Sequence, residues 1–191
     1  MLTHTDLMSL EQYARTRPEF RAKVMAHKKN RHVALGPNAT LYFEDRLTMQ
    51  YQVQEMLRLE RMFEPELIQE ELDVYNPLIP DGSNWKATFM IEFSDPEERK
   101  VQLGKMIGIE KAVWVQVADF ARVTPIANED LDRETEEKTS SVHFLRFELT
   151  PPMIAALKSG AALTMGIDHP AYQATVKPSA AVRESLLSDL S

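Results

Sequence analysis

Seven short segments in which apolar and polar residues alternate place the strongest constraint on the fold of this chain. They span residues 31–36, 40–44, 85–93, 112–118, 142–149, 163–168 and 172–176. Alternation with a period of two is typical of a β-strand with one buried face. The first two segments are joined across Gly36-Pro37-Asn38 and the last two across His169-Pro170. Links this short favour antiparallel pairing, because a parallel crossover needs a dozen or more residues.

Helical periodicity occupies most of the remaining chain. Residues 7–24, 46–64, 65–75, 95–108, 150–159 and 178–190 carry it. Pro18 is expected to divide the first of these regions into two helices, because proline fits best in the first turn of a helix. Helices mixed with antiparallel strands predict an α+β fold: a single domain over residues 1–191, mainly one antiparallel sheet, with helices packed on one face. A sheet partly closed around a pocket is the alternative.

The composition excludes several classes of protein. The 191 residues include no cysteine, so the chain has no disulfide, no zinc site built on thiolates and no iron–sulfur cluster of its own. Acidic residues outnumber basic ones by 29 to 22, and the net charge of −7 argues against nucleic acid as the main partner. No apolar run reaches the ~20 residues of a membrane helix, and the first residues show no signal-peptide pattern. We therefore expect a cytoplasmic protein without membrane insertion.

Motifs of nucleotide and hydrolase chemistry are missing from the sequence. The chain has six glycines, and neither G-x-G-x-x-G nor a Walker A loop occurs among them. We therefore expect no bound nucleotide. The G-x-S-x-G and H-E-x-x-H motifs are also absent, so neither a serine hydrolase nor a zinc protease is indicated.

Residues 126–141 are the most polar stretch of the chain. They hold eight acidic or basic side chains among few apolar ones. A segment with so little apolar surface gains little from burial, so we expect an exposed, mobile, acidic loop.

Two predicted helices carry an acidic residue within an apolar arc. In the helix over residues 46–64 this residue is Glu60, and in the helix over residues 65–75 it is Glu71. Burying a carboxylate is unfavourable unless it is paired or neutralised. Three explanations stay open: an internal ion pair, an arc that is only partly buried so that the acids lie at its edge, or a metal or acid–base site. Candidate ion-pair partners are Arg58, Arg61 and Arg31.

The helix over residues 46–64 also carries a row of polar side chains, which are Tyr51, Gln52, Glu55 and Arg58. One interpretation is a site for a small ligand or a partner protein, in which Arg58 fixes an anionic group. The other is a surface pair, because Glu55 and Arg58 are three residues apart and can contact each other along the helix. Arg31, in a basic cluster before the first strand, is a further candidate for an anion contact.

A second hypothesis is a metal-dependent enzyme, redox or hydrolytic. Carboxylate and imidazole ligands suit iron, manganese or zinc, although the Glu-x-x-His pattern of di-iron helices is absent. His169 follows Asp168 at a hairpin tip, where turn chemistry is the alternative role. His143 lies on the apolar face of a strand and is expected to be a hydrogen-bonded core residue. The candidate ligands are Glu44, Glu55, Glu60, Glu92 and His169.

Sequence blocks over nearly the whole chain resemble the bacterial domain-of-unknown-function family numbered 3501. The blocks are residues 9–13, 17–21, 31–37, 43–44, 51–58, 60–61, 75–78, 90–92, 147–149 and 169–172. The most specific of them is Tyr51-Gln52-Val53-Gln54-Glu55. The family has no established activity, so no catalytic residue carries over. Genes of this family often lie beside those for rubrerythrin and an iron–sulfur oxidoreductase, which implies a cytoplasmic role near peroxide defence or electron transfer.

The sequence therefore supports two hypotheses about function. The first is an accessory or binding protein that uses the Tyr51–Arg58 row together with Glu44 and Glu92, and its implied partners are rubrerythrin or an iron–sulfur oxidoreductase. The second is the metal-dependent enzyme. A purely structural role for the acids, such as a homodimer interface, is a third interpretation.

Overall fold

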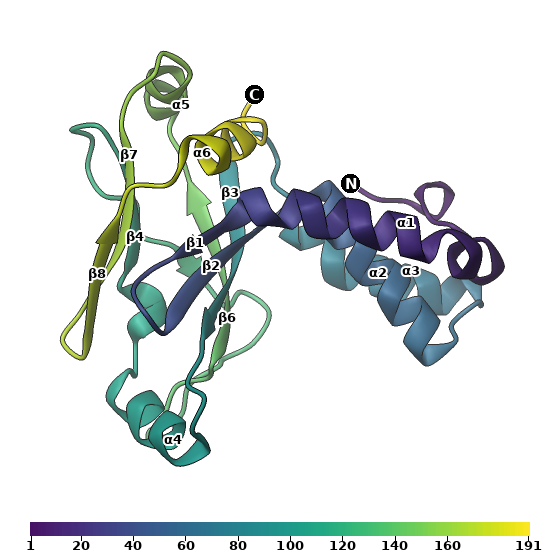
Figure 1. Ribbon diagram of the computed structural model, residues 1–191, viewed down its shortest axis with the longest axis horizontal. Coiled ribbons are helices and arrows are strands. Elements are labelled where there is room, and N and C mark those ends of the chain that lie inside the picture. The colour runs from purple at the N-terminus through teal and green to yellow at the C-terminus, as the bar shows by residue number, and fades with distance from the viewer. The chain divides into compact units, whose positions relative to one another are not determined.

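The computed structural model describes residues 1–191, which form two compact units. The helical unit comprises residues 1–30 and 44–80, and the sheet unit comprises residues 31–43 and 81–191 (Figure 1). Helices and antiparallel strands make up the chain, so the predicted α+β class is confirmed. None of the helices combines the length and apolar character that crossing a membrane requires.

The helical unit is a set of packed helices. Its elements are η1 (His4–Asp6), α1 (Leu10–Lys28), α2 (Arg46–Glu60), α3 (Pro65–Tyr75) and η3 (Asn76–Leu78). The Asp45 carboxylate accepts from the Thr48 amide and begins α2, and Arg61 ends it with a left-handed backbone, φ 53°. α1 packs against α2, and α2 against α3. A small apolar core lies among these helices: Leu2, Met49, Val53, Leu57 and Leu72.

α1 is one continuous helix, which corrects the predicted break at Pro18. Proline within a helix removes one backbone hydrogen bond and crowds the preceding turn. Side chains on both sides of Pro18 are nevertheless anchored, since Tyr13 and Val24 are fully buried. Tyr13 also contacts the ring of Phe20 edge-on, at a centroid distance of 6.1 Å. Packing at both ends of the helix therefore outweighs the local cost of the proline.

The sheet unit contains two antiparallel sheets, whereas the sequence predicted one. The strands are β1 (His32–Ala34), β2 (Ala39–Glu44), β3 (Asn84–Ile91), β4 (Val113–Val117), β5 (Ile126–Ala127), β6 (Val142–Glu148), β7 (Leu163–His169) and β8 (Tyr172–Val176). One sheet has the order β1-β2-β3-β6-β5 and the other the order β4-β7-β8. Neither sheet closes around a pocket. The helical elements of this unit are α4 (Pro96–Lys105), η4 (Ile109–Lys111), α5 (Pro151–Lys158) and α6 (Ala180–Leu187), while the short η2 (Lys29–Arg31) spans the boundary between the two units.

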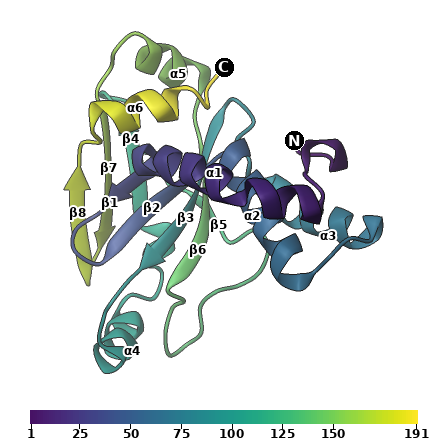
Figure 2. The same ribbon diagram turned by 45° about the vertical axis from the view of Figure 1, so that its right-hand side comes forward.

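One apolar core joins the two sheets and their helices. Strand β3 shows why, because its alternating residues Trp85, Ala87, Phe89 and Ile91 are all buried. The Trp85 indole also donates to the Leu186 carbonyl at 2.9 Å, which holds α6 on the sheet. Figures 1 and 2 show α4 at the end of this unit opposite to α5 and α6.

The turn between β1 and β2 is fixed by strand β8. The Tyr172 hydroxyl donates to the Leu35 carbonyl at 2.5 Å and accepts from the Asn38 amide at 3.1 Å. Gly36 lies directly beneath it with φ 76°, and a Cβ there would approach the hydroxyl oxygen to 2.6 Å. Glycine is therefore required at this position for both its backbone and its lack of a side chain.

Candidate functional site

The predicted polar row of α2 contains a cluster centred on Glu55. The Glu55 carboxylate accepts from the Tyr13 hydroxyl at 2.6 Å and from Arg17 Nε at 2.7 Å and Nη2 at 3.2 Å. Arg58 donates to the same carboxylate at 3.4 Å, so the predicted contact between Glu55 and Arg58 is confirmed. Tyr13 and Arg17 belong to α1. Glu55 therefore ties α1 to α2 and is largely satisfied within the protein.

The partners of Glu55 determine its protonation. The bidentate contact with Arg17 is the main cause that lowers the pKa of Glu55 from 4.5 to about 2, and the hydrogen bond from Tyr13 acts in the same direction. Burial and the adjacent carboxylate raise the pKa of Tyr13 well above its ordinary range. Glu55 is thus a carboxylate and Tyr13 a neutral hydrogen-bond donor at neutral pH. Neither is poised to transfer a proton.

The other members of the row are also engaged by the helical unit or lie at its surface. Tyr51 is nearly buried, contacts the Phe20 ring at a centroid distance of 6.2 Å, and lies under the Lys28 ammonium at 5.6 Å. Gln52 is half-buried. The Arg58 side chain is 41% exposed, which leaves it the most accessible polar group of the row.

Arg31 is not accessible to a ligand, which corrects its assignment as an anion contact. Its side chain is 1% exposed and belongs to the sheet unit. The guanidinium donates to the Phe43 carbonyl at 3.0 Å, to the Ser185 hydroxyl at 3.1 Å and to the Asp189 carboxylate at 2.5 Å. These acceptors surround the group on several sides. Arg31 therefore fixes α6 and the C-terminal residues on the sheet.

The structure does not bring together the five candidate metal ligands. Glu44, Glu55 and Glu60 belong to the helical unit, whereas Glu92 and His169 belong to the sheet unit. No three His, Asp or Glu side chains lie close enough to one another to hold a metal ion. Each of these residue types suits a metal, but the topology spreads them over separate elements. The sequence pattern could not reveal this, because it carries no distance between helices and strands.

His169 has the turn role that the sequence offered as its alternative. Its Nδ1 accepts from the Ala171 amide at 3.1 Å, and its Nε2 donates to the Ile107 carbonyl at 2.9 Å. The neighbouring Asp168 faces Arg122 at 3.7 Å instead of the imidazole. The imidazole therefore stabilises the β7–β8 hairpin and its contact with the segment after α4.

Of the three explanations for Glu60 and Glu71, the structure supports a partly buried arc. Glu60 is the last residue of α2 and is exposed, as are Arg58 and Leu59 beside it. Glu71 is half-buried at the edge of the buried side of α3. Burial is the main cause that raises the pKa of Glu71, and the charges of Glu60 and Glu70 raise it further. No ion pair neutralises these acids, so the internal ion pair with an arginine, one of the three open explanations, is not formed.

We give the name acidic–apolar face to a set of exposed or half-buried residues at the end of α2, in the link after it and on the outward side of α3. Its members are Leu59, Glu60, Phe63, Leu67, Glu70, Glu71 and Val74. Leu59, Phe63 and Val74 are 61%, 70% and 61% exposed. Positions 67, 70, 71 and 74 share one side of α3, while Ile68, Leu72 and Tyr75 pack into the core on the other side. Exposed apolar side chains next to unneutralised acids are typical of an interaction surface.

The sequence placed Leu67 and Val74 in an apolar arc and left open whether that arc is fully buried, so it did not identify this surface. A signal was present, because the apolar arc of residues 65–75 is wider than one neighbouring helix can cover. Leu67 and Val74 are the residues left over. Tyr13 and Arg17 were also missed as partners of Glu55, since residues 38 or more positions apart carry no mark of contact in a single sequence.

Comparisons with known proteins give a family match and a match to a solved structure. The model of a protein family of unknown function, DUF3501, matches residues 1–190. A crystal structure of a protein of unknown function from Burkholderia pseudomallei has a TM-score of 0.94 and 49% sequence identity, and the match covers 100% of this chain and 99% of that one. A comparison with curated proteins gives no match. The match over essentially its whole length shows that the chain belongs to the DUF3501 family.

Proposed function

We propose that this chain is an accessory protein of the bacterial cytoplasm that binds a partner protein through its acidic–apolar face. The single observation that carries this proposal is the exposure of Leu59, Phe63 and Val74 on a face that also holds unneutralised Glu60 and Glu71. Single exposed apolar residues are common on protein surfaces, whereas several on one pair of helices indicate a binding surface.

The chemistry of the face specifies the partner. Apolar side chains favour a partner with aromatic or aliphatic residues at the centre of the contact. The charges of Glu60, Glu70 and Glu71 repel one another, and the raised pKa of Glu71 reflects that repulsion together with burial. A lysine or arginine of a partner would relieve it. The expected partner is therefore a protein that presents basic residues beside an apolar patch.

A second copy of the chain fits this face poorly. A two-fold contact through the face would place Glu60, Glu70 and Glu71 of one copy against the same acids of the other. Like charges in an interface cost several kcal/mol (about 2–4) when no cation separates them. We therefore propose that a different protein, and not a second copy of this chain, binds the face.

The family resemblance suggests two partners to test first, a rubrerythrin and an iron–sulfur oxidoreductase of the same organism. Each would be purified and titrated against this chain by calorimetry at low and high salt. We expect one of them to bind saturably, and its affinity to fall as salt screens the charges of the face. A role beside a redox protein would also fit a chain that has no cysteine and holds no cluster itself.

Variants of the face decide whether it is the binding surface. Leu59→Ser combined with Phe63→Ser should weaken binding at least about tenfold, since exposed apolar anchors dominate interface energetics. Val101→Ser is the matched control, because Val101 is 55% exposed but lies on α4 of the sheet unit. Failure of both proteins to bind, or equal binding by the face variant and the control, would contradict the proposal.

A further inference from the structure

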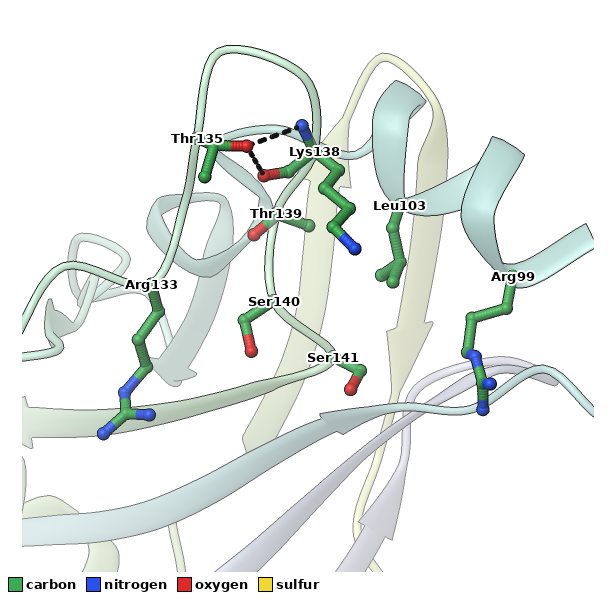
Figure 3. A pocket seen from close by; sticks show the side chains of 8 residues that line it. All are labelled: Arg99, Leu103, Arg133, Thr135, Lys138, Thr139, Ser140 and Ser141. Carbon is green, nitrogen blue, oxygen red and sulfur yellow. Dashed lines mark hydrogen bonds between the residues drawn. The ribbon is translucent and has the colours of Figure 1, made fainter. Parts of the chain in front are cut away.

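We infer that the sheet unit has a second binding site, a pocket for a tetrahedral oxyanion such as a phosphate group. The pocket lies between α4 and residues 133–141 and has a volume of about 390 Å³. Three cationic side chains line it, together with hydroxyl groups and the apolar side chain of one leucine, and no acidic residue takes part. Figure 3 shows Arg99 entering from α4, Arg133 on the opposite side, and Lys138 extending into the space between them.

Backbone contacts hold the loop that forms one wall of the pocket. The Thr139 amide donates to the Leu103 carbonyl of α4 at 3.1 Å, and the Ser140 amide donates to the Arg133 carbonyl at 2.8 Å. Glu134 turns the other way, since its carboxylate accepts from the Gly108 amide at 3.1 Å and from Lys111 at 3.3 Å. The Glu134 carboxylate is therefore tied to Gly108 and to Lys111 of the neighbouring η4 segment.

The cations of the pocket are incompletely neutralised. Arg133 pairs with Asp130 and stacks on the Phe144 ring at 4.7 Å, and its Nε is buried without a hydrogen-bond partner. Neither the Arg99 guanidinium nor the Lys138 ammonium forms an ion pair or a hydrogen bond. Cationic groups that face a shared space repel one another, and this chain has a surplus of acids that could have paired with them. A bound anion would supply the negative charge that neutralises these cations.

A buried histidine holds the hydroxyl-bearing wall of the pocket. His143 is fully buried, and burial lowers its pKa, so the ring is neutral. Its Nδ1 lies 2.9 Å from the Asn128 amide nitrogen, which can only donate. Its Nε2 therefore carries the proton and donates to the Ser140 carbonyl and to Thr139 Oγ1, both at 2.9 Å. The Thr139 hydroxyl accepts from the histidine, and because this side chain is only 1% exposed, the contact fixes the wall of the pocket from within.

The two partly exposed serines supply hydroxyl donors to the pocket. Ser140 Oγ accepts from the Val142 amide at 3.1 Å, so its hydrogen is also free to donate. The Ser141 hydroxyl forms no hydrogen bond within the protein and lies on the pocket wall in Figure 3. Three cations and the Ser140 and Ser141 hydroxyls line the space. A tetrahedral group with oxygens in several directions fits this arrangement better than a planar carboxylate, and the volume admits a small phosphorylated molecule around it.

Calorimetry with inorganic phosphate tests the pocket directly. The intact chain should bind phosphate saturably at constant ionic strength, whereas chloride should give no saturable signal. Sulfate and phosphoserine as parallel titrants distinguish a site for any tetrahedral anion from one that prefers a phosphate monoester. Arg99→Met combined with Lys138→Met should weaken phosphate binding at least about tenfold, since both unpaired cations are removed. Lys105→Met is the matched control, because Lys105 is an exposed cation of α4 outside the pocket.

A second readout places the ligand in the pocket. In a titration followed by NMR, the amide of Thr139 and the Nε2–H signal of His143 should shift with the same affinity as the heat signal. A response without saturation, equal binding by the double variant and the Lys105→Met control, or unshifted Thr139 and His143 signals would overturn the inference.

Discussion

The two units of this protein each hold a guanidinium against a carboxylate, and the two pairs differ in exposure. In the sheet unit, Arg31 and Asp189 have side chains that are 1% and 7% exposed. In the helical unit, Arg17 and Glu55 are 32% and 14% exposed. The first pair also engages carbonyl groups of β2 and α6, whereas the second engages a tyrosine hydroxyl and a second, half-solvated arginine.

This difference shows how the two units use charge. A buried pair is committed to the fold, because either partner left alone would be a charge without water or a counter-ion. In the helical unit, by contrast, Glu55 is paired with Arg17, whereas Glu60 and Glu71 form no ion pair. Charge in the sheet-unit pair therefore stabilises structure, while surplus charge in the helical unit remains available to a partner.

The largest effect should come from breaking the buried pair. Arg31→Met removes the guanidinium that pairs with the buried Asp189 carboxylate and deprives the Phe43 and Ser185 carbonyls of their donor. We expect the free energy of unfolding to fall by about 3–5 kcal/mol, measured by urea denaturation. Adding Asp189→Leu should recover part of the loss, since the carboxylate that paired with Arg31 is then removed as well. A loss below about 1 kcal/mol would mean that Asp189 is hydrated and that the two pairs are alike.

Breaking the half-exposed pair should have a smaller effect that depends on pH. Glu55→Gln should destabilise the protein by about 1–2 kcal/mol at pH 7, since it weakens hydrogen bonds to a charged group. The folded pKa of Glu55, about 2, lies below its ordinary value of 4.5. Its contribution is therefore complete above pH 4.5 and is lost as the pH falls toward 2. Urea denaturation at several pH values should show the wild type and Glu55→Gln converging in acid.

A surface pair provides the control for that experiment. Arg15 and Glu11 form an ion pair at 2.5 Å on α1, but their side chains are 76% and 77% exposed. Glu11→Gln should change stability by less than about 0.5 kcal/mol at any pH. Equal effects of Glu11→Gln and Glu55→Gln would show that the partial burial of Glu55 is irrelevant.

The sequence predicted the strands well because alternation reports directly on burial. Trp85, Ala87, Phe89 and Ile91 are buried as their spacing indicates, and the β1–β2 and β7–β8 hairpins occur where Gly36 and Pro170 predicted turns. Alternation identifies the buried face of a strand but not the strand beside it. The division into two sheets was for this reason not visible in the sequence.

The site was less predictable because it depends on contacts between distant residues. The Glu55–Arg58 contact was foreseen from helical spacing, whereas the stronger partners of Glu55 come from α1. Arg31 is buried by Ser185 and Asp189, more than 150 positions away. The unbroken α1 follows the same rule, since packing of Tyr13 and Val24 overrides the local preference of Pro18. Periodicity gives the direction of a side chain, but not whether a neighbour reaches it.

The smallest effect should come from neutralising an acid that the helical unit leaves unpaired. Burial, Glu60 and Glu70 raise the folded pKa of Glu71 above its ordinary value of 4.5, so its ionised form is a cost to the fold at neutral pH. The stability that a protonated Glu71 gives is present below pH 4.5 and is lost as the pH rises through the folded pKa. Glu71→Gln should therefore stabilise the protein slightly at pH 7, by about 0.5 kcal/mol, and have no such benefit in acid.

The same substitution should weaken binding of the basic partner, because it removes one of the charges that recruit it. Glu66→Gln is the control, since Glu66 is an exposed acid in the first turn of α3 outside the acidic–apolar face. If the variant is more stable and also binds more weakly, the charge of Glu71 destabilises the fold but strengthens binding of the partner. If Glu71→Gln lowers stability at pH 7, Glu71 has a counter-ion within the fold, and the contrast between the two units disappears.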